Sequence, residues 1–276
     1  MEVSKNPVTF RWLGVGGVEL SAGGQVLVVD PFFTRPRFSA LWGRRVIPNR
    51  SLVAGQLAWA DFVLVTHAHY DHLMDVPEVL RSRGAVAYAS PNACRILAAE
   101  GIPPGQIHEI GAGAKLELGE FKIEAGLGVH EPTPLDVIIN RPLAARLEPP
   151  LRLWDYRMDT CLSFLIQVNG LRIQCGGQHN PADVLLINPN KDPDHYRPLL
   201  QVVQPRLVIP IHWDDFFSPL TRPLRPMLAP PRWAWPPFGK IDLARFKRTI
   251  EEMSPLASVL VPEIFYSYDL NQVSLI

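Results

Sequence analysis

The chain has 276 residues, of which 47% are hydrophobic and 20% charged, the composition of a globular protein with a substantial core rather than of a disordered chain. Its 27 basic and 27 acidic side chains give no net charge, so no overall field attracts nucleic acid or anionic lipid. Three scattered cysteines exclude a disulfide framework and favour a reducing, cytoplasmic setting. No secretory leader and no apolar run of roughly 18 residues is visible, so we expect a soluble protein without a transmembrane segment.

The first half of the chain predicts a sheet covered by helices. Residues 26–29 are all apolar, as in a strand buried on both faces, and Asp30-Pro31 ends that strand. One helix is expected over 73–83 and another over 91–100, each followed by a glycine that can end it. The expected strands are residues 8–13, 15–20, 25–30, 61–66 and 86–89.

The second half predicts hairpins and then strands that alternate with helices. Asn169-Gly170 is a strong hairpin signal between two apolar runs. Proline-rich excursions at about 131–159 and 218–239 predict long loops, which in compact domains are usually functional or disordered. We therefore expect one domain over 1–276, with packed sheets and helices outside. The expected strands are 115–118, 121–125, 160–168, 171–175, 183–187, 207–210 and 258–261, and the expected helices are 194–203 and 241–253.

A cluster of metal-binding side chains follows the strand expected at 61–66: His67, His69, Asp71 and His72. Residues two apart share a face of a strand, so the first two imidazoles should point the same way. Nitrogen and oxygen donors at this spacing suit Zn²⁺, with Mn²⁺ or Fe²⁺ as alternatives. The competing interpretation is a polar helix start, in which Asp71 or His72 acts as a cap.

Further ligands should come from other strand ends, because one cluster cannot close a coordination sphere. His130 and His212 each follow an apolar run and are the candidates. His108 and His195 lie in a connection and at a helix start, so a structural role is favoured for both.

These residues resemble the metallo-β-lactamase superfamily, and most nearly its stand-alone hydrolases similar to ascorbate-6-phosphate lactonase. The likeness covers about residues 10–261 and rests on the His67–His72 motif, Asp30-Pro31, His130 and the segment that ends in His212-Trp213. It implies an α/β fold, a four-layer αβ/βα sandwich with metals at the sheet ends. It also implies one or two metals, one held by His67, His69 and His130, and the other by Asp71, His72 and His212.

The chain departs from this superfamily at one position. A Gly-Asp pair usually follows the strand expected at 171–175, and its carboxylate bridges the two metals. Gly177 stands at that place here. Three outcomes are open: a single metal, a substitute ligand, or a site that is no longer catalytic. His179 is the first candidate substitute, ahead of Cys175 and Asp183.

The site predicts hydrolysis of a small ester, lactone or phosphodiester-type substrate, because a bound metal lowers the pKa of water to about 7. Asp71 would be a ligand or, with the second site empty, a base that orients water. Metal-bound histidines need an acceptor on their other ring nitrogen, and Asp30 is the better candidate, ahead of Asp61.

The substrate is expected to be small, and an anionic substrate would fit the arginines of the 131–159 excursion. Arg141 and Arg157 are the candidates to bind a phosphate or carboxylate, with solvated loop charges as the alternative. Trp213, next to His212, is the aromatic residue expected to contact substrate. Trp154, Tyr156, Phe216 and Phe217 are equally compatible with a substrate-binding wall or with the core.

Three other functions compete with this one. A catalytically silent binding or sensing protein is favoured by Gly177 and opposed by the other six ligands. A nuclease is disfavoured by the zero net charge, so no nucleic-acid partner is expected. A barrel amidohydrolase also uses His-x-His, but there the motif would be expected on the first strand, whereas here several strands precede it.

Overall fold

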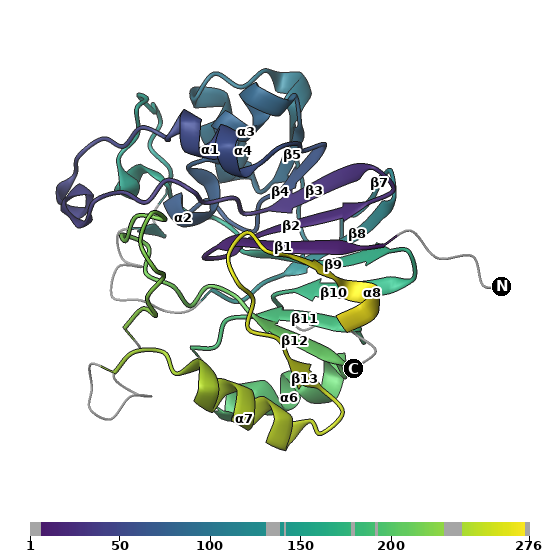
Figure 1. Ribbon diagram of the computed structural model, residues 1–276. Helices are drawn as coiled ribbons and strands as arrows, with labels where there is room; N and C mark the ends of the chain where they lie inside the picture. The colour runs from purple at the N-terminus through teal and green to yellow at the C-terminus, as the bar shows by residue number, and fades with distance from the viewer. Residues whose placement is uncertain are drawn as a thin grey trace.

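The protein is described by a computed structural model over residues 7–130, 139–140, 142–177, 180–190, 193–228 and 239–273. Two seven-stranded sheets pack face to face, with helices on both outer sides (Figure 1). This confirms the predicted α/β class and four-layer αβ/βα arrangement. No helix in the described ranges combines the length and apolarity required to cross a membrane.

The first sheet is built mainly from the N-terminal half of the chain. Its strands β3, β4 and β5 run parallel, so their C-terminal ends share one edge. In spatial order the strands are β14 (Ser267–Asp269), β1 (Thr9–Gly14), β2 (Gly17–Ala22), β3 (Gln25–Val29), β4 (Phe62–Leu64), β5 (Val86–Ala89) and β6 (Ile107–Glu109).

The second sheet comes from residues 115–259, and its strands β10, β11 and β12 are also parallel. Their spatial order is β13 (Ser258–Val259), β12 (Leu207–Pro210), β11 (Val184–Ile187), β10 (Leu171–Cys175), β9 (Leu162–Val168), β8 (Phe121–Leu127) and β7 (Lys115–Leu118).

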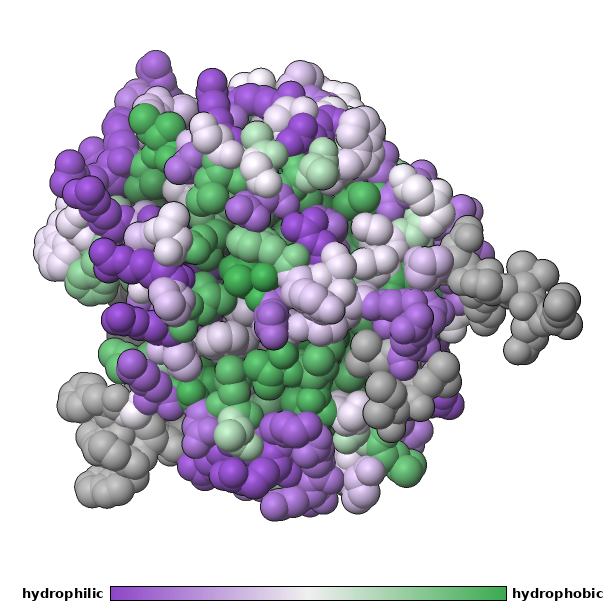
Figure 2. Space-filling model, in the orientation of Figure 1, coloured by the Kyte–Doolittle hydropathy of each residue, from purple (hydrophilic) through white to green (hydrophobic). Residues whose placement is uncertain are grey.

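The helices form the two outer layers. In Figure 1, α1, α3 and α4 lie beyond the first sheet, whereas α6 and α7 lie beyond the second. Figure 2 shows polar side chains over the outer face of α7, at the bottom of the view, while Phe246 and Ile250 of this helix are buried. The helices are α1 (Arg50–Gln56), α2 (Tyr70–Leu73), α3 (Val76–Arg83), α4 (Pro91–Ala99), α6 (Pro193–Val203), α7 (Leu243–Met253) and α8 (Leu270–Val273), with 3₁₀ turns η1 (Phe38–Trp42), η2 (Pro104–Gln106) and η3 (Leu153–Asp155).

Alternating side chains connect the layers into three apolar clusters. In β3, Leu27 and Val29 join the cluster between the sheets, and Val28 joins the cluster under α3 and α4. In β12, Ile209 faces the other sheet and Val208 faces α6 and α7. Because these strands are covered on both faces, their sequences read as unbroken apolar runs.

Several boundaries differ from the sequence prediction. Val15 has φ of +46° and lies in the turn between β1 and β2, not in a strand. The helix expected over 73–83 begins only at Val76 as α3, and Leu73 ends the separate short helix α2, because Pro77 has no amide to donate to the carbonyl of Leu73. The strands β6 and β14 and the helix α1 were not predicted, since each is short.

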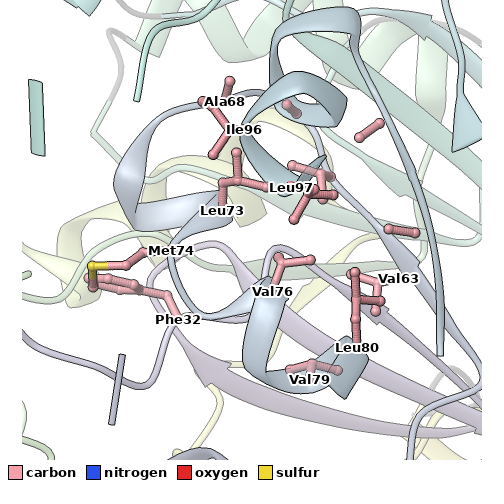
Figure 3. Close-up of a cluster of buried hydrophobic side chains, with 14 of the residues drawn as sticks. Phe32, Val63, Ala68, Leu73, Met74, Val76, Val79, Leu80, Ile96 and Leu97 are labelled. Atoms are coloured by element: carbon pink, nitrogen blue, oxygen red, sulfur yellow. The ribbon is translucent and has the colours of Figure 1, made fainter. Parts of the chain in front are cut away.

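The cluster between α3, α4 and the first sheet supports the segment that bears the histidine motif. Leu73 of α2 lies near Ile96 and Leu97 of α4 and Val76 of α3 (Figure 3), and Leu80 of α3 belongs to the same cluster. All of these side chains are fully buried. The position of the motif therefore depends on this packing.

We expect Leu80→Ala to lower the free energy of unfolding by about 2–5 kcal/mol, because it removes a fully buried side chain and leaves a cavity. Chemical denaturation would measure the change. Leu256→Ala is the control, since Leu256 is 91% exposed and its truncation should change stability by less than about 0.5 kcal/mol. Equal effects of the two substitutions would contradict this packing.

Candidate metal centre

The predicted ligands meet at the edge of the sandwich where parallel strands end. His67 and His69 follow β4, and Asp71 and His72 belong to α2. His130 follows β8, and His212 follows β12 of the second sheet. All six side chains line one cavity of about 410 Å³.

The six side chains form two groups. The first group consists of His67, His69 and His130, and the second consists of Asp71, His72 and His212; in each group one ligand atom per residue lies within 4.8 Å of the others. The rings of His67 and His72 join the groups, with centroids 3.9 Å apart. The residues from the motif are buried, whereas His130 and His212 are partly exposed.

The ring orientation of His67 is fixed by Thr66 and Asp30. The Thr66 hydroxyl donates to Asp30 Oδ2 at 2.5 Å, so its oxygen accepts from Nδ1 of His67 at 2.9 Å. Nδ1 therefore carries the proton, and Nε2 keeps a lone pair. Nε2 is buried and has no hydrogen-bond partner in the described structure. A buried nitrogen lone pair without a donor fits a metal ion.

His69 is oriented in a similar way from the opposite side. Its Nε2 lies 3.1 Å from Asn140 Oδ1, an acceptor, so Nε2 carries the proton and Nδ1 has the lone pair. Burial and the neighbouring His72 and His69 lower the pKa of His67 well below its usual range. His67 is therefore neutral, as an imidazole ligand must be.

The second group carries negative charge around His72. Nδ1 of His72 lies 2.7 Å from Asp30 Oδ2, and Nε2 lies 3.2 Å from Asp71 Oδ2. Burial disfavours the charged imidazole, but Asp71 and Asp30 outweigh it and raise the pKa of His72 to about 10. Burial also opposes ionisation of Asp71, yet His72 and His212 hold the pKa of that carboxyl well below its usual range. The two carboxylates thus favour a positive charge at the second group.

Glycine at position 16 makes room for these rings. A Cβ at Gly16 would lie 3.0 Å from Cε1 of His72 and 3.5 Å from Cδ2 of His212. A Cβ contact of 3.0 Å is tighter than nine in ten real ones, so a side chain at position 16 would require the ring of His72 to shift by a few tenths of an ångström.

The structure places Gly177, the position where the superfamily usually has the bridging aspartate, at the cavity. Gly177 lines the cavity just beyond β10, with φ of +67°. Cys175 lines the cavity too, and burial together with Asp30 and Cys161 raises the pKa of its thiol. Asp183 instead accepts the backbone amide of Arg172 at the start of β11, outside the cavity lining. His179 lies outside the described residues.

The substrate contacts predicted from sequence are placed differently. Trp213 is buried in the core and stacks on Trp12, with centroids 5.0 Å apart, so it does not line the cavity. Arg157 donates to the carbonyls of Trp154 and Pro142, which fastens its own loop. Both interpretations are corrected for the same reason: these side chains are used internally. Arg141 lies outside the described residues.

Other lining residues were missed or left open by the sequence. Ile139 and Tyr156, from the predicted excursion, line the cavity, as does Phe216, whose ring meets that of His212 edge-on. His195, for which a structural role was favoured, also belongs to the lining. Asn140 could not be found from sequence, because only the loop conformation brings it to His69.

Comparison with known families agrees with this geometry. A family model described as a beta-lactamase superfamily domain matches residues 26–213, which include the motif and His212. The chain therefore belongs to the beta-lactamase superfamily.

Relatives of the chain are metal-dependent hydrolases. One from Pyrobaculum arsenaticum is 27% identical over 218 residues, which cover 77% of this chain and 86% of that protein. One from Methylocella silvestris is 28% identical over 123 residues, or 43% of this chain and 46% of that protein. Igni18, a metallo hydrolase from the archaeon Ignicoccus hospitalis, has the same fold, with a TM-score of 0.63 and 18% identity over 95% of this chain and 97% of its own. The predicted class, a metal-dependent hydrolase of this superfamily, is confirmed.

We expect Gly16→Ala to weaken metal binding, because the added methyl, 3.0 Å from Cε1 of His72, must displace the His72 ring by a few tenths of an ångström. Equilibrium dialysis followed by elemental analysis would measure it. Gly55→Ala is the matched control, since a Cβ there meets nothing within 4 Å. If Gly16→Ala binds metal as tightly as the control, the close approach of the turn is not required.

Proposed function

We propose that this protein hydrolyses a small ester, lactone or phosphodiester-type substrate with a water molecule activated by metal at the two groups. The observation that carries the proposal is the convergence of five imidazoles and one carboxylate on one cavity, with Nε2 of His67 buried and without a partner. Each of the three motif histidines has an oxygen acceptor at its other ring nitrogen, the usual support of a metal ligand.

His67, His69 and His130 would hold one metal, and Asp71, His72 and His212 a second. Zn²⁺ suits this nitrogen-rich set, and Mn²⁺ or Fe²⁺ are the alternatives. When bound, the metal supplies a lowered pKa for water and polarises the oxygen of the substrate that gains charge.

The residues of this chain hold and orient the reacting groups. Asp71 Oδ2 lies 3.2 Å from Nε2 of His72 and 3.3 Å from Nε2 of His212, which fixes its carboxylate toward the second group. If only the first group is filled, this carboxylate is the base that orients the water. Asp30 holds Nδ1 of His72, so Nε2 of the ring points into the site.

The cavity wall favours a substrate with an apolar body. Away from the metal ligands, the described lining carries a large set of apolar side chains: Val129, Ile139, Leu162, Leu185, Leu186, Ile187, Leu199, Ile211, Phe216 and Met227. These side chains exclude water around the substrate and offer it contact area. A carboxylic ester or lactone therefore fits this wall better than a phosphodiester.

Gly177 makes a catalytically silent binding protein the second candidate. A bridging carboxylate would be absent from both metals, which weakens the attraction that holds two cations together. A hydrolysis screen of the metal-loaded protein with ester, lactone and phosphodiester substrates separates the two functions. Turnover that disappears with a chelator and returns with Zn²⁺ supports the enzyme, and binding without turnover supports the alternative.

We expect His67→Ala and His69→Ala each to remove the metal of the first group, because each deletes one of its three imidazoles. Metal content per chain and activity on the best substrate of the screen should fall together. His108→Ala is the control, since His108 lies on β6 and stacks on Tyr88. Full metal content in both variants would contradict the assignment.

We expect Gly177→Asp to raise the amount of metal bound per chain, because it returns an anionic ligand to the cavity edge. Aspartate tolerates the left-handed backbone at φ of +67° better than most residues do. Gly177→Asn has the same size without the charge and should not raise metal binding. Equal metal content in the wild type and in both variants would show that this strand end does not face the metals.

A further inference from the structure

His212 differs from the motif histidines in how its ring is held. Its Nε2 lies 3.2 Å from Nε2 of His72, but its Nδ1 is buried without a hydrogen-bond partner. Asp71 Oδ2 lies 3.3 Å from its Nε2, but no acceptor of the described chain holds Nδ1, and His212 has φ of +61°, which is uncommon for a residue with a side chain. The main chain of His212 therefore carries part of the positioning of this ring.

The main chain of His212 is tied to the turn between β1 and β2. The amide of His212 donates to the carbonyl of Val15 at 2.7 Å, and Nε1 of Trp12 donates to the same oxygen at 3.0 Å. Val15 is itself β-branched with φ of +46°, a conformation that persists only when its surroundings impose it. Two unfavourable backbone conformations thus support each other across the two sheets.

Asp214 completes a clamp on this turn. Its Oδ1 accepts the amide of Val15 at 2.8 Å, two residues along the chain from His212. The turn between Gly14 and Gly17 is therefore bound through both the carbonyl and the amide of Val15. The same turn carries Gly16, which packs on the rings of His72 and His212.

Arg35 holds the carboxylate of Asp214. Nη2 of Arg35 lies 2.8 Å from Oδ2, and the two side chains are 1% and 0% exposed. Nη1 of Arg35 donates to the carbonyl of Asp215, and the guanidinium lies over the ring of Phe32. A buried ion pair is costly to desolvate, and its best-attested use is to specify one geometry.

We propose that Asp214, held by Arg35, is a positioning residue that fixes His212 for the second metal through the main chain of Val15. This inference rests on the proposed function, because it assigns a role toward the metal of the second group. The clamp joins the two segments that carry His212 and Gly16, whereas His67, His69 and His130 follow β4 and β8. Its loss should therefore affect the second group selectively.

The test is a Co²⁺ titration of the metal-free full-length protein, followed by visible absorption, together with metal content after dialysis. We expect Asp214→Ala to raise the Kd of the second metal about 10- to 100-fold, the usual effect of losing a group that supports a ligand. The first metal should bind as in the wild type. His212→Ala serves as the reference for a site that has lost the second group.

Two further variants separate positioning from general stability. Glu19→Ala breaks the ion pair of Glu19 with Arg11, at 2.8 Å on β1 and β2, and should lower the unfolding temperature without changing the Co²⁺ spectrum. Asp214→Asn keeps an oxygen for the amide of Val15 but loses the charge, so it should bind the second metal with intermediate affinity. If Asp214→Ala does not fold, Asp214→Asn takes its place in the test.

The outcomes distinguish this inference from the proposed function. The inference alone would be overturned if the wild type binds the second metal, His212→Ala loses it, and the Asp214 variant binds it with the affinity and spectrum of the wild type. A wild type that takes up no metal would overturn the proposed function and the inference with it. A selective loss at the second group, absent in Glu19→Ala, supports the positioning role.

Discussion

The site depends on the contacts of the Asp30 carboxylate with Thr66, which follows β4, and with His72 of α2. Asp30 accepts the amide and the hydroxyl of Thr66 and receives Nδ1 of His72. One carboxylate therefore joins the end of β3, the end of β4 and α2. Asp30 has φ of +45°, a region in which aspartate is more often found than other residues with side chains. The chain turns at this point and the carboxylate stays inside.

The hydrogen bonds among Asp30, Thr66 and the two histidines also determine which ring nitrogen of His67 and of His72 can bind metal. Because the Thr66 hydroxyl gives its proton to Asp30, it must accept from His67, and the lone pair of His67 is left at Nε2. His72 is fixed by the same carboxylate through Nδ1. Two ligands of different groups are thus oriented by one buried charge, which couples the two halves of the site.

Much of the fold and site could be predicted from sequence because the signals are local. Apolar runs such as 26–29 mark strands covered on both faces, and the spacing of His67, His69, Asp71 and His72 depends only on a strand followed by a helix. His130 and His212 were predicted from their places at strand ends. Asn140, Asp214 and the turn at Val15 could not be predicted, because their contacts span long stretches of chain and depend on loop conformations. Trp213 was misassigned since a buried and a substrate-binding tryptophan look alike in sequence.

The division of the ligands between the sheets has a mechanical consequence. The motif residues follow β4 of the first sheet, whereas His130 and His212 follow strands of the second sheet. At the same edge, the amide of Leu162 donates to the carbonyl of Thr66, so the backbones of the two sheets are also bonded there. A cation bound by ligands from both segments would hold the two sheets together at this edge of the sandwich. A ligand that binds only the folded state increases the stability of that state. Loss of the metal should therefore allow the two sheets to separate locally, first at this edge.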